Sequence, residues 1–342
     1  MPPKAFICGL SGTELTPDEF DFLRGMKPGG IILFARNCQT QRQVRALTSA
    51  IFDALEDQNA LILIDQEGGR VQRMAPPEWK KFPSAAQFTK FYKNDPDRGE
   101  STLRTCYGWL AQGLRKHGIN VNCAPVLDVP QEEAHPIIGD RAYGNNPGDV
   151  IRLGRLVAEA HLENGVVPIM KHIPGHGRAL VDSHEELPDV SSSPDELENW
   201  DFVPFRAMSN LPAAMTSHVR YICYDRTQPG SSSVELIHQV IRSQIGFDGL
   251  LISDDIGMKA LKGTPSERMM SVLSAGCDMG LHCNGDLQEM RSIADAVPSL
   301  EGAALSRYRA IQKIIRTSNE KTEIIQGDTI HRLLDEVFSL TD

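Results

Sequence analysis

The sequence predicts an α/β fold, a single-domain (β/α)8 barrel of the TIM type, and three observations support this prediction. Eight short apolar runs recur along the 342 residues, and each is followed by a longer amphipathic stretch. No linker-like or low-complexity stretch separates two domains. Polar residues follow several of the apolar runs, at the positions where barrel strands end and where active sites of such barrels are built.

The eight apolar runs are predicted to be β-strands because they are short and rich in apolar or β-branched residues. They are residues 5–10, 30–35, 61–65, 119–129, 166–171, 213–218, 250–255 and 277–283. Strands that alternate with helices form a parallel sheet covered by helices. Eight such units in a chain of this length fit a closed barrel better than a doubly wound sheet, which would usually need fewer strands or a second domain.

Helices are predicted between the strands from start signals and apolar spacing. Thr16-Pro17-Asp18-Glu19 and Ser193-Pro194-Asp195-Glu196 each offer a capping hydroxyl, then a proline suited to the first helical position, then acids near the positive end of the helix dipole. Apolar residues at three-to-four spacing indicate helices in segments 40–58, 147–164 and 233–245. The tail from about 286 to 340 is interpreted as the last barrel helix plus one or two additions. Residues 1–342 are therefore predicted to form one catalytic domain with a C-terminal helical extension at about 298–342.

The composition restricts the partners. A net charge of −10 without a basic stripe argues against nucleic acid and against an anionic membrane surface. The first residues, MPPKAFICGL, are too weakly apolar for a signal peptide, and no run approaches the ~18 apolar residues of a membrane span. We therefore expect a cytoplasmic protein with a small-molecule substrate, and a monomer, because nothing marks an obligate interface.

Polar residues after the predicted strands are expected to meet at the C-terminal mouth of the barrel. The candidates are Asp65 with the loop from Gln66 to Arg73, Asp128, Lys171, His172, His218, Asp254, Asp255, His282 and Asp286. Singly, an aspartate at a strand end is more often a cap or turn residue, and His218 or His282 is more often a hydrogen-bonded packing residue. Together they favour an enzyme.

Residues 171–184, KHIPGHGRALVDSH, allow two kinds of chemistry. A metal site could use His172, His176, Asp182 and His184, but Pro174 and two glycines exclude the helical His-x3-His pattern of zinc hydrolases. A proton-transfer role fits better. Asp182 and His184 would project to the same side of an extended segment, and a carboxylate fixes the tautomer of an imidazole and supports its cationic form. Gly175 and Gly177 would let the loop bend.

The strand LLISDD supplies a second reactive group. Neighbouring strand residues face opposite ways, so only one of Asp254 and Asp255 should point into the mouth. A carboxylate there could attack an anomeric carbon or activate a water molecule.

Five motifs together resemble glycoside hydrolase family 3, in its single-domain bacterial branch of cytosolic β-N-acetylhexosaminidases of peptidoglycan recycling. They are IDQEGGRVQR, IIGDRAYG, KHIPGHG, DSH and LLISDDIGMKA, and the resemblance runs from roughly residue 5 to 285. It implies a TIM barrel that removes terminal β-linked N-acetylglucosamine from cell-wall fragments containing N-acetylmuramic acid, such as GlcNAc-anhydroMurNAc and its peptides. It also implies retention of configuration, with no metal and no cofactor.

By motif, the resemblance implies specific roles. Asp254 looks like the nucleophile, His184 like the acid/base, and Asp182 like the partner of His184. A histidine acid/base departs from the usual pair of carboxylates. The residues that look like sugar contacts are Asp65, Arg73, Arg141, Lys171 and His172, with Asp128 in the same shell. The charge of Lys171 should also help to keep Asp254 ionised.

The sequence departs from the family pattern at one position, and several alternative functions remain open. Many relatives continue GHG with an acidic residue, whereas Arg178 follows here, so closure of the loop or the environment of His184 is expected to differ. His176 is expected to shape the loop. The alternative functions are another family 3 β-glycosidase (β-glucosidase or β-xylosidase), a metal-dependent barrel hydrolase and a sugar-binding barrel without catalysis.

Overall fold

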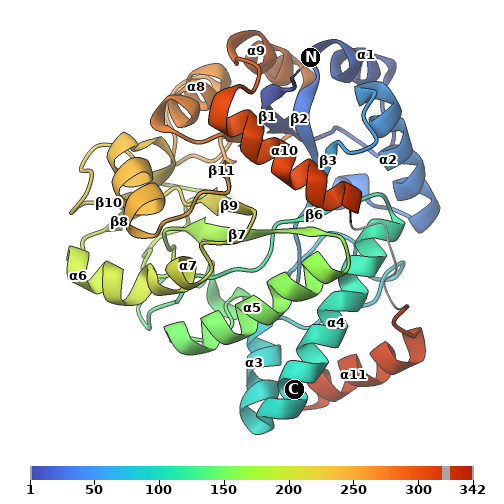
Figure 1. The fold of residues 1–342 in the computed structure, drawn as a ribbon, viewed down its shortest axis with the longest axis vertical. Helices are drawn as coiled ribbons and strands as arrows, with labels where there is room; N and C mark the ends of the chain where they lie inside the picture. Colours follow the sequence, from blue (N-terminus) through green and yellow to red (C-terminus); the bar gives the residue numbers. More distant parts are fainter. Residues whose placement is uncertain (1, 318–323, 341–342) are drawn as a thin grey trace.

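A computed structural model describes residues 2–317 and 324–340, and its centre is a closed ring of eight parallel strands (Figure 1). The strands in ring order are β1 (Lys4–Cys8), β12 (Met279–His282), β11 (Leu250–Asp255), β9 (Ala213–Thr216), β7 (Val167–Ile173), β6 (Val121–Asn122), β3 (Leu61–Ile64) and β2 (Pro28–Leu33). Each falls in or overlaps one of the eight predicted runs, so the predicted barrel is confirmed.

Helices follow the strands and cover the outside of the ring. They are α1 (Pro17–Met26), α2 (Gln41–Leu55), α3 (Ala85–Asn94), α4 (Pro96–Lys116), α5 (Pro147–Glu163), α6 (Pro194–Glu196), α7 (Val203–Ala207), α8 (Pro265–Ala275), α9 (Leu287–Ala296), α10 (Gly302–Thr317) and α11 (Gly327–Ser339). Two π-helices are η3 (Leu197–Asp201) and η5 (Leu236–Gln244), and three short 3-10 turns are η1 (Ala35–Asn37), η2 (Gly139–Arg141) and η4 (Gly230–Ser232). Both predicted start signals are confirmed, because Thr16 and Ser193 form capping boxes with Glu19 and Glu196.

Two short sheets lie outside the ring. β4 (Gln66–Gly68) and β5 (Val71–Gln72) form an antiparallel hairpin directly after β3, and β8 (Asp189–Val190) pairs with β10 (Arg220–Tyr221). The hairpin begins one residue after Asp65, so it extends from the C-terminal end of a barrel strand. It therefore lies at the mouth of the barrel.

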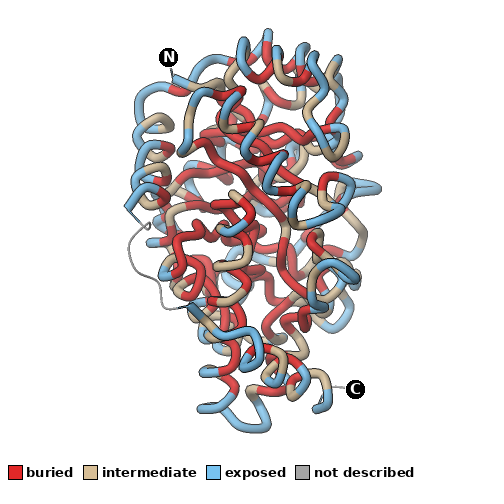
Figure 2. The backbone as a smooth tube through the Cα atoms, turned by 90° about the vertical axis from the view of Figure 1, so that its right-hand side faces the viewer, coloured by how far each residue is buried: buried red, intermediate tan, exposed pale blue. Residues whose placement is uncertain are grey.

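The strands divide the core into two layers. Alternate residues point into the barrel or toward the helices: Ile7 and Leu63 belong to the inner cluster, whereas Phe6 and Ile62 belong to the cluster under the helices. Figure 2 shows the buried backbone concentrated along the centre of the molecule, with exposed segments around it. The continuous apolar runs of the sequence reflect burial on both sides of each strand.

Helix α10 packs against the inner cluster at the N-terminal end of the ring, where Tyr308 and Ile311 join it (Figure 1). Helix α11 packs on α3 and α4, and Arg98 pairs with Glu336 at 2.7 Å. These two helices correspond to the predicted extension at 298–342, apart from 318–323 and 341–342, which lie outside the described residues. That residues 1–342 form one domain remains a prediction, and this packing supports it.

A buried hydrogen-bond chain connects the helix layer with the mouth. The Asn122 side chain on β6 accepts from the Gln66 N–H and donates to the Gln66 carbonyl, so it fixes the start of the hairpin. It also contacts His161 Nε2 on α5 at 2.9 Å. Because His161 Nδ1 bonds the Val157 carbonyl, Nδ1 carries the proton and Nε2 accepts from Asn122.

No helix among the described residues is long and apolar enough to cross a membrane.

The buried His161 predicts a pH-dependent contribution to the stability of the fold. Burial lowers the pKa of His161 to about 4. Below pH ~6.5 the unfolded chain binds a proton at this residue that the folded chain does not bind until about pH 4. The stability from neutral His161 is therefore present above pH ~6.5 and is lost as the pH falls. In His161→Gln, the slope of unfolding free energy against pH in this window should decrease by up to about 1.4 kcal/mol per pH unit.

Urea unfolding at several pH values measures these slopes. The exposed His238 provides the control, and His238→Gln should leave the slope unchanged. An unchanged slope in His161→Gln would contradict the assignment of this proton to His161.

Candidate active site

A cavity of about 390 Å³ opens at the C-terminal ends of the barrel strands. Seven of the predicted site residues line it: Asp65, Arg73, Arg141, Lys171, His172, His184 and Asp254. Asp128, His176 and Asp182 do not line it and instead contact residues that do or their neighbours. His218, His282 and Asp286 were also expected at the mouth and do not line the cavity: Asp286 caps α9, and His282 lies 3.3 Å from Glu289. The expected convergence at the mouth is therefore present, with the candidates divided into lining and supporting groups.

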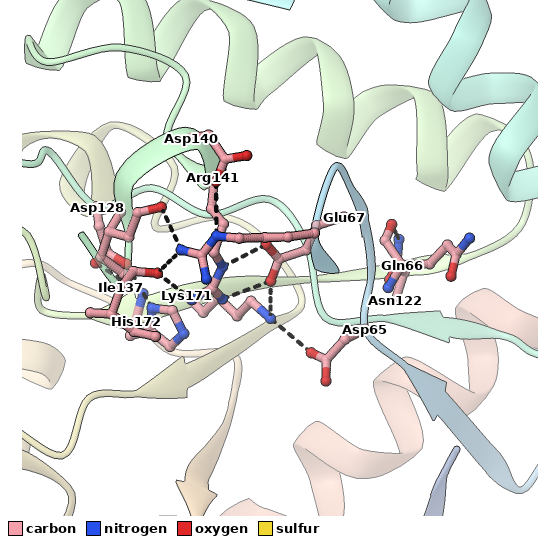
Figure 3. Close-up of polar contacts among 12 residues, drawn as sticks. Asp65, Gln66, Glu67, Asn122, Asp128, Ile137, Asp140, Arg141, Lys171 and His172 are labelled. Carbon is pink, nitrogen blue, oxygen red and sulfur yellow. Dashed lines mark hydrogen bonds and ion pairs between the residues drawn. The ribbon is translucent and has the colours of Figure 1, made fainter. Parts of the chain in front are cut away.

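A buried ion cluster forms one wall of the cavity (Figure 3). Lys171, only 2% exposed, places its Nζ 2.8 Å from Asp65 Oδ1 and 2.6 Å from Glu67 Oε1. Arg73 donates a hydrogen bond to the other oxygen of Asp65 at 3.1 Å, and Arg141 donates two hydrogen bonds of 2.8 Å to Glu67. Burial alone would raise the pKa values of both carboxyls, but the cations keep them well below their usual range, to about 2 for Glu67.

Glu67 lies in the loop that was expected at the mouth, but it was not among the residues predicted to contact the sugar, although it organises this cluster. It is buried and does not line the cavity, yet its ion pairs fix the positions of both Lys171 and Arg141, which do line it. The sequence carried one usable signal, because Asp65 and Glu67 are two residues apart at the start of a hairpin and can face the same side. The bidentate geometry holds the Arg141 guanidinium in a single orientation.

Two strands that carry cavity-lining residues, β11 and β7, depart from strict alternation. The ladder of β11 shifts register between Ile252 and Asp255, and both Asp254 and Asp255 line the cavity. The ladder of β7 shifts between Lys171 and Ile173, and successive residues Lys171 and His172 both line it. The prediction that only one aspartate would face the mouth is therefore wrong, because these strand ends are irregular.

Hydrogen bonds distinguish the two aspartates. Asp255 Oδ1 accepts from the N–H groups of Gly257 and Cys283, so this carboxylate holds the backbone of two segments together. Among the described residues, the carboxylate of Asp254 accepts only from the Asp255 N–H, at 2.8 Å. Asp254 is therefore the carboxylate of the pair that is left available for a ligand.

The surroundings of Asp254 favour its ionised form. Burial acts to raise its pKa, but His172 and His218 and the Asp255 N–H outweigh burial and hold the pKa below its ordinary value. Among the contributions that lower the pKa, the largest come from these histidines. Lys171, which was expected to help keep Asp254 ionised, is not a main contributor, because its charge is directed at Asp65 and Glu67. His218 is otherwise a buried packing residue, as expected, and bonds Ser231 and the Asp255 carbonyl.

Asp182 and His184 form a pair, but through a turn and not through an extended segment. Asp182 Oδ1 accepts from the His184 N–H at 2.9 Å and lies 2.7 Å from His184 Nδ1. This is an Asx-type turn, in which the aspartate binds the backbone two residues later. The pKa of Asp182 is lowered, because the two bonds from His184 outweigh partial burial. An ionised Asp182 can only accept, so His184 Nδ1 carries a proton and Nε2 remains free.

Asp128 supports the part of the cavity lining that His172 forms beside Lys171. Its carboxylate is fully buried and accepts from His172 Nδ1 at 2.6 Å and from the His176 N–H at 2.6 Å. The first bond fixes His172 at the cavity wall. Beyond it, the two glycines of this segment are closely packed: a Cβ on Gly177 would lie 2.1 Å from the Val129 carbonyl oxygen, and Gly175 is held at φ 144°. Gly175 therefore provides the backbone bend that the sequence predicted, and Gly177 in addition permits close contact with Val129.

Arg178 stands where many family relatives have an acidic residue. Its contacts with the rest of the protein lie outside the cavity. Its Nε lies 2.6 Å from Asp201 Oδ2 at the end of η3, and its Nη1 bonds Ser192. Asp201 is almost fully buried, and burial raises its pKa to about 6 although Arg178 opposes this shift. Arg178 therefore joins the loop to η3 and has no hydrogen bond or ion pair with Asp182 or His184 among the described residues.

The proposed metal ligands do not form a metal site. Within residues 2–317 and 324–340, no group of three or more His, Cys, Asp or Glu side chains is placed to hold a metal ion. His172 and His176 are instead engaged with Asp128 and Ser183.

The ion cluster predicts that replacing the buried Lys171 lowers the unfolding free energy much more than replacing an exposed lysine. Lys171→Met leaves two buried carboxylates short of a counterion and should reduce the unfolding free energy by about 3–5 kcal/mol. Lys93→Met, which breaks the exposed pair with Asp149, should change it by less than about 1 kcal/mol. Denaturant unfolding at pH 7 measures both values, and similar effects of the two substitutions would contradict the role of Lys171.

Comparison with known proteins identifies the family of the chain. The chain matches the Glycosyl hydrolase family 3 N terminal domain over residues 14–317. It is 40% identical to a protein named Beta-hexosaminidase from Alkalilimnicola ehrlichii over 283 residues, which cover 81% of this chain and 80% of that protein.

Solved structures show the same similarity. NagZ from Neisseria gonorrhoeae superposes with a TM-score of 0.87 at 30% identity, covering 100% of this chain and 99% of that one, and it has also been crystallised with N-trifluoroacetyl-D-glucosamine. A family 3 β-N-acetylglucosaminidase from Paenibacillus gives 0.85 at 25% identity, covering 98% of this chain and 67% of that one. The chain therefore belongs to glycosyl hydrolase family 3 and is a glycosidase of the β-hexosaminidase type.

Proposed function

We propose that the protein is a retaining exo-β-N-acetylglucosaminidase with Asp254 as nucleophile and His184 as acid/base. The observation that carries the proposal is the combination found in one cavity: an available ionised carboxylate, an imidazole oriented by a second carboxylate, and a wall of fixed cations. Each part performs one task in a double displacement.

In the first step a carboxylate oxygen of Asp254 attacks C1 of the sugar. As the bond from C1 to the glycosidic oxygen breaks, Nε2–H of cationic His184 transfers its proton to that oxygen, and the leaving group departs as an alcohol. Asp182 stabilises the cationic imidazole through Nδ1. The product of this step is a glycosyl ester on Asp254 and a neutral His184.

In the second step a water molecule attacks C1 from the side that the leaving group vacated. Neutral His184 accepts a proton from the water at Nε2, the bond from C1 to Asp254 breaks, and the carboxylate is restored. Two inversions at C1 give overall retention. The exposed side chain of His184, 61% accessible, leaves access for both a leaving group and water.

The ion cluster is suited to holding the sugar ring. Lys171, Arg141 and Arg73 present donors, and Asp65 presents acceptor oxygens, all on the cavity wall. Because these groups are locked by one another, they do not have to be ordered when the sugar binds. His172, oriented by Asp128, adds a further polar contact.

The substrate assignment rests on similarity. The names of the relatives support N-acetylglucosamine as the sugar that is released. The five motifs described above support muropeptide and anhydro-muropeptide fragments such as GlcNAc-anhydroMurNAc as the natural substrates. A cytoplasmic location and a monomeric state belong to the same proposal. β-Glucosidase or β-xylosidase activity is the alternative, and turnover of aryl glucosides and xylosides beside the N-acetylglucosaminide separates it.

The two catalytic roles predict different products when azide rescues a variant. Asp254→Ala should reduce turnover of an aryl N-acetylglucosaminide by several orders of magnitude, and azide should restore it by forming the α-glycosyl azide, because only one inversion then occurs. His184→Ala should spare kcat/KM for activated aryl leaving groups, reduce it for poor ones, and give the β-glycosyl azide. Rates and the anomeric configuration by NMR are the measurements.

The exposed Asp295 provides the control, since Asp295→Ala should behave as the unmodified enzyme. The assignment of the nucleophile is wrong if Asp254→Ala retains near-normal turnover. The assignment of the acid is wrong if His184→Ala loses activity equally on good and poor leaving groups.

A further inference from the structure

We propose that His176 is a positioning residue that holds the turn carrying Asp182 and His184 in place through Ser183. The inference rests on the proposed role of His184 as acid/base, and it assigns a function to a buried histidine that the steps above do not use. His176 does not line the cavity, so it would act only through its neighbours.

The burial pattern identifies the attachment point of the turn. Between residues 180 and 187, Ser183 is the only buried residue, with 2% exposure, whereas His184 and Leu180 are exposed. Ser183 Oγ lies 3.0 Å from His176 Nε2. The flanks of the turn are held by backbone hydrogen bonds from His135 to Ala179 and from Arg220 to Pro188. Between these flanks, the buried anchor is Ser183, which lies between Asp182 and His184.

His176 can act as a fixed support because its own position is determined from several sides. Its N–H donates to Asp128 at 2.6 Å, its ring meets the His172 ring edge to face at 5.7 Å, and Gly177 packs directly on Val129. Asp128 also orients His172 at the cavity wall. One buried carboxylate thus sets the positions of a cavity-lining imidazole and of the support for the turn.

The other contacts of the turn are weaker or local. The bonds between Asp182 and His184 lie within the turn and do not fix it to the barrel. Outside the turn, the His184 carbonyl accepts from the Lys259 N–H at 3.4 Å, which is a long hydrogen bond. Loss of the His176 contact should therefore let His184 move relative to Asp254, and displacements of about 1 Å can cost on the order of 100-fold in rate.

The chemistry of His176 suits a structural hydrogen bond and not proton transfer. Burial is the main reason that its pKa is lowered to about 4, so the ring is neutral at pH 7. Its Nδ1 is buried and has no hydrogen-bond partner among the described residues. Among the described residues, the ring thus makes one hydrogen bond, and its partner is Ser183 Oγ. The simpler interpretation is that His176 only fills space, and the two interpretations predict different kinetics.

The test is a double-mutant cycle on kcat/KM with two N-acetylglucosaminides, one with an activated aryl leaving group and one with a poor leaving group. His176→Ala and Ser183→Ala are measured alone, together, and each in the His184→Ala background. We expect each single substitution to lower kcat/KM about 10- to 100-fold on the poor leaving group and by less than about 3-fold on the activated one. The two together should cost no more than one alone, and neither should cost anything further when His184 is absent.

Two further variants sharpen the test. His176→Gln can place an amide group near the position of Nε2 and should restore part of the loss, which space filling alone would not require. The exposed His238 serves as the control through His238→Ala, which should leave both rates unchanged. Ser183→Ala keeps the proposal testable if His176→Ala does not fold, because a serine hydroxyl can be removed with little change in volume.

The possible failures are distinguishable. Equal losses on both leaving groups, or the same loss with and without His184, would show that His176 acts on general stability and would overturn the inference alone. If the unmodified enzyme turns over N-acetylglucosaminides but His184→Ala shows no dependence on the leaving group, the acid/base assignment fails, and this inference fails with it.

Discussion

The structure of the mouth depends on the need to neutralise one buried cation. Lys171 lies at the end of β7 with almost no exposure, and a buried ammonium group without partners would be strongly destabilising. Its partners come from the segment after β3: Asp65 at the strand end and Glu67 in the hairpin. Glu67 then requires Arg141 from η2. Charge neutralisation thus fixes three segments that are distant in sequence, and it places polar groups at one wall of the cavity.

A second buried charge has a comparable role on the side of the reacting groups. Asp128 receives a ring N–H from His172 and backbone N–H groups from both His172 and His176. From His176 the contacts continue to Ser183 and so to the turn that carries His184. The cavity lining therefore contains locked ion pairs suited to binding, and buried imidazoles held by Asp128 connect it with the exposed His184. Asp254 lines the same cavity, and His172 and His218 help to lower its pKa.

Much of the fold could be predicted from the sequence, because strand burial on two sides and helix caps such as Thr16 are local signals. The residues lining the mouth followed from barrel geometry. What could not be predicted depends on contacts between distant segments. The register shifts that turn both Asp254 and Asp255 toward the cavity are set by neighbouring strands. The partner of Arg178, Asp201, is 23 residues away on a π-helix, and the packing of Gly177 against Val129 has no local signal.

The central claim is that two adjacent aspartates share the cavity and that hydrogen bonding leaves only Asp254 available to form a bond with the sugar. The most direct measurement is to trap the glycosyl-enzyme with a slowly hydrolysed fluorinated N-acetylglucosaminide, digest it at low pH, and locate the added mass by tandem mass spectrometry of the peptide containing residues 250–259. The account predicts one sugar, attached to Asp254. Attachment to Asp255, or turnover of the reagent without any adduct on this peptide, would contradict it.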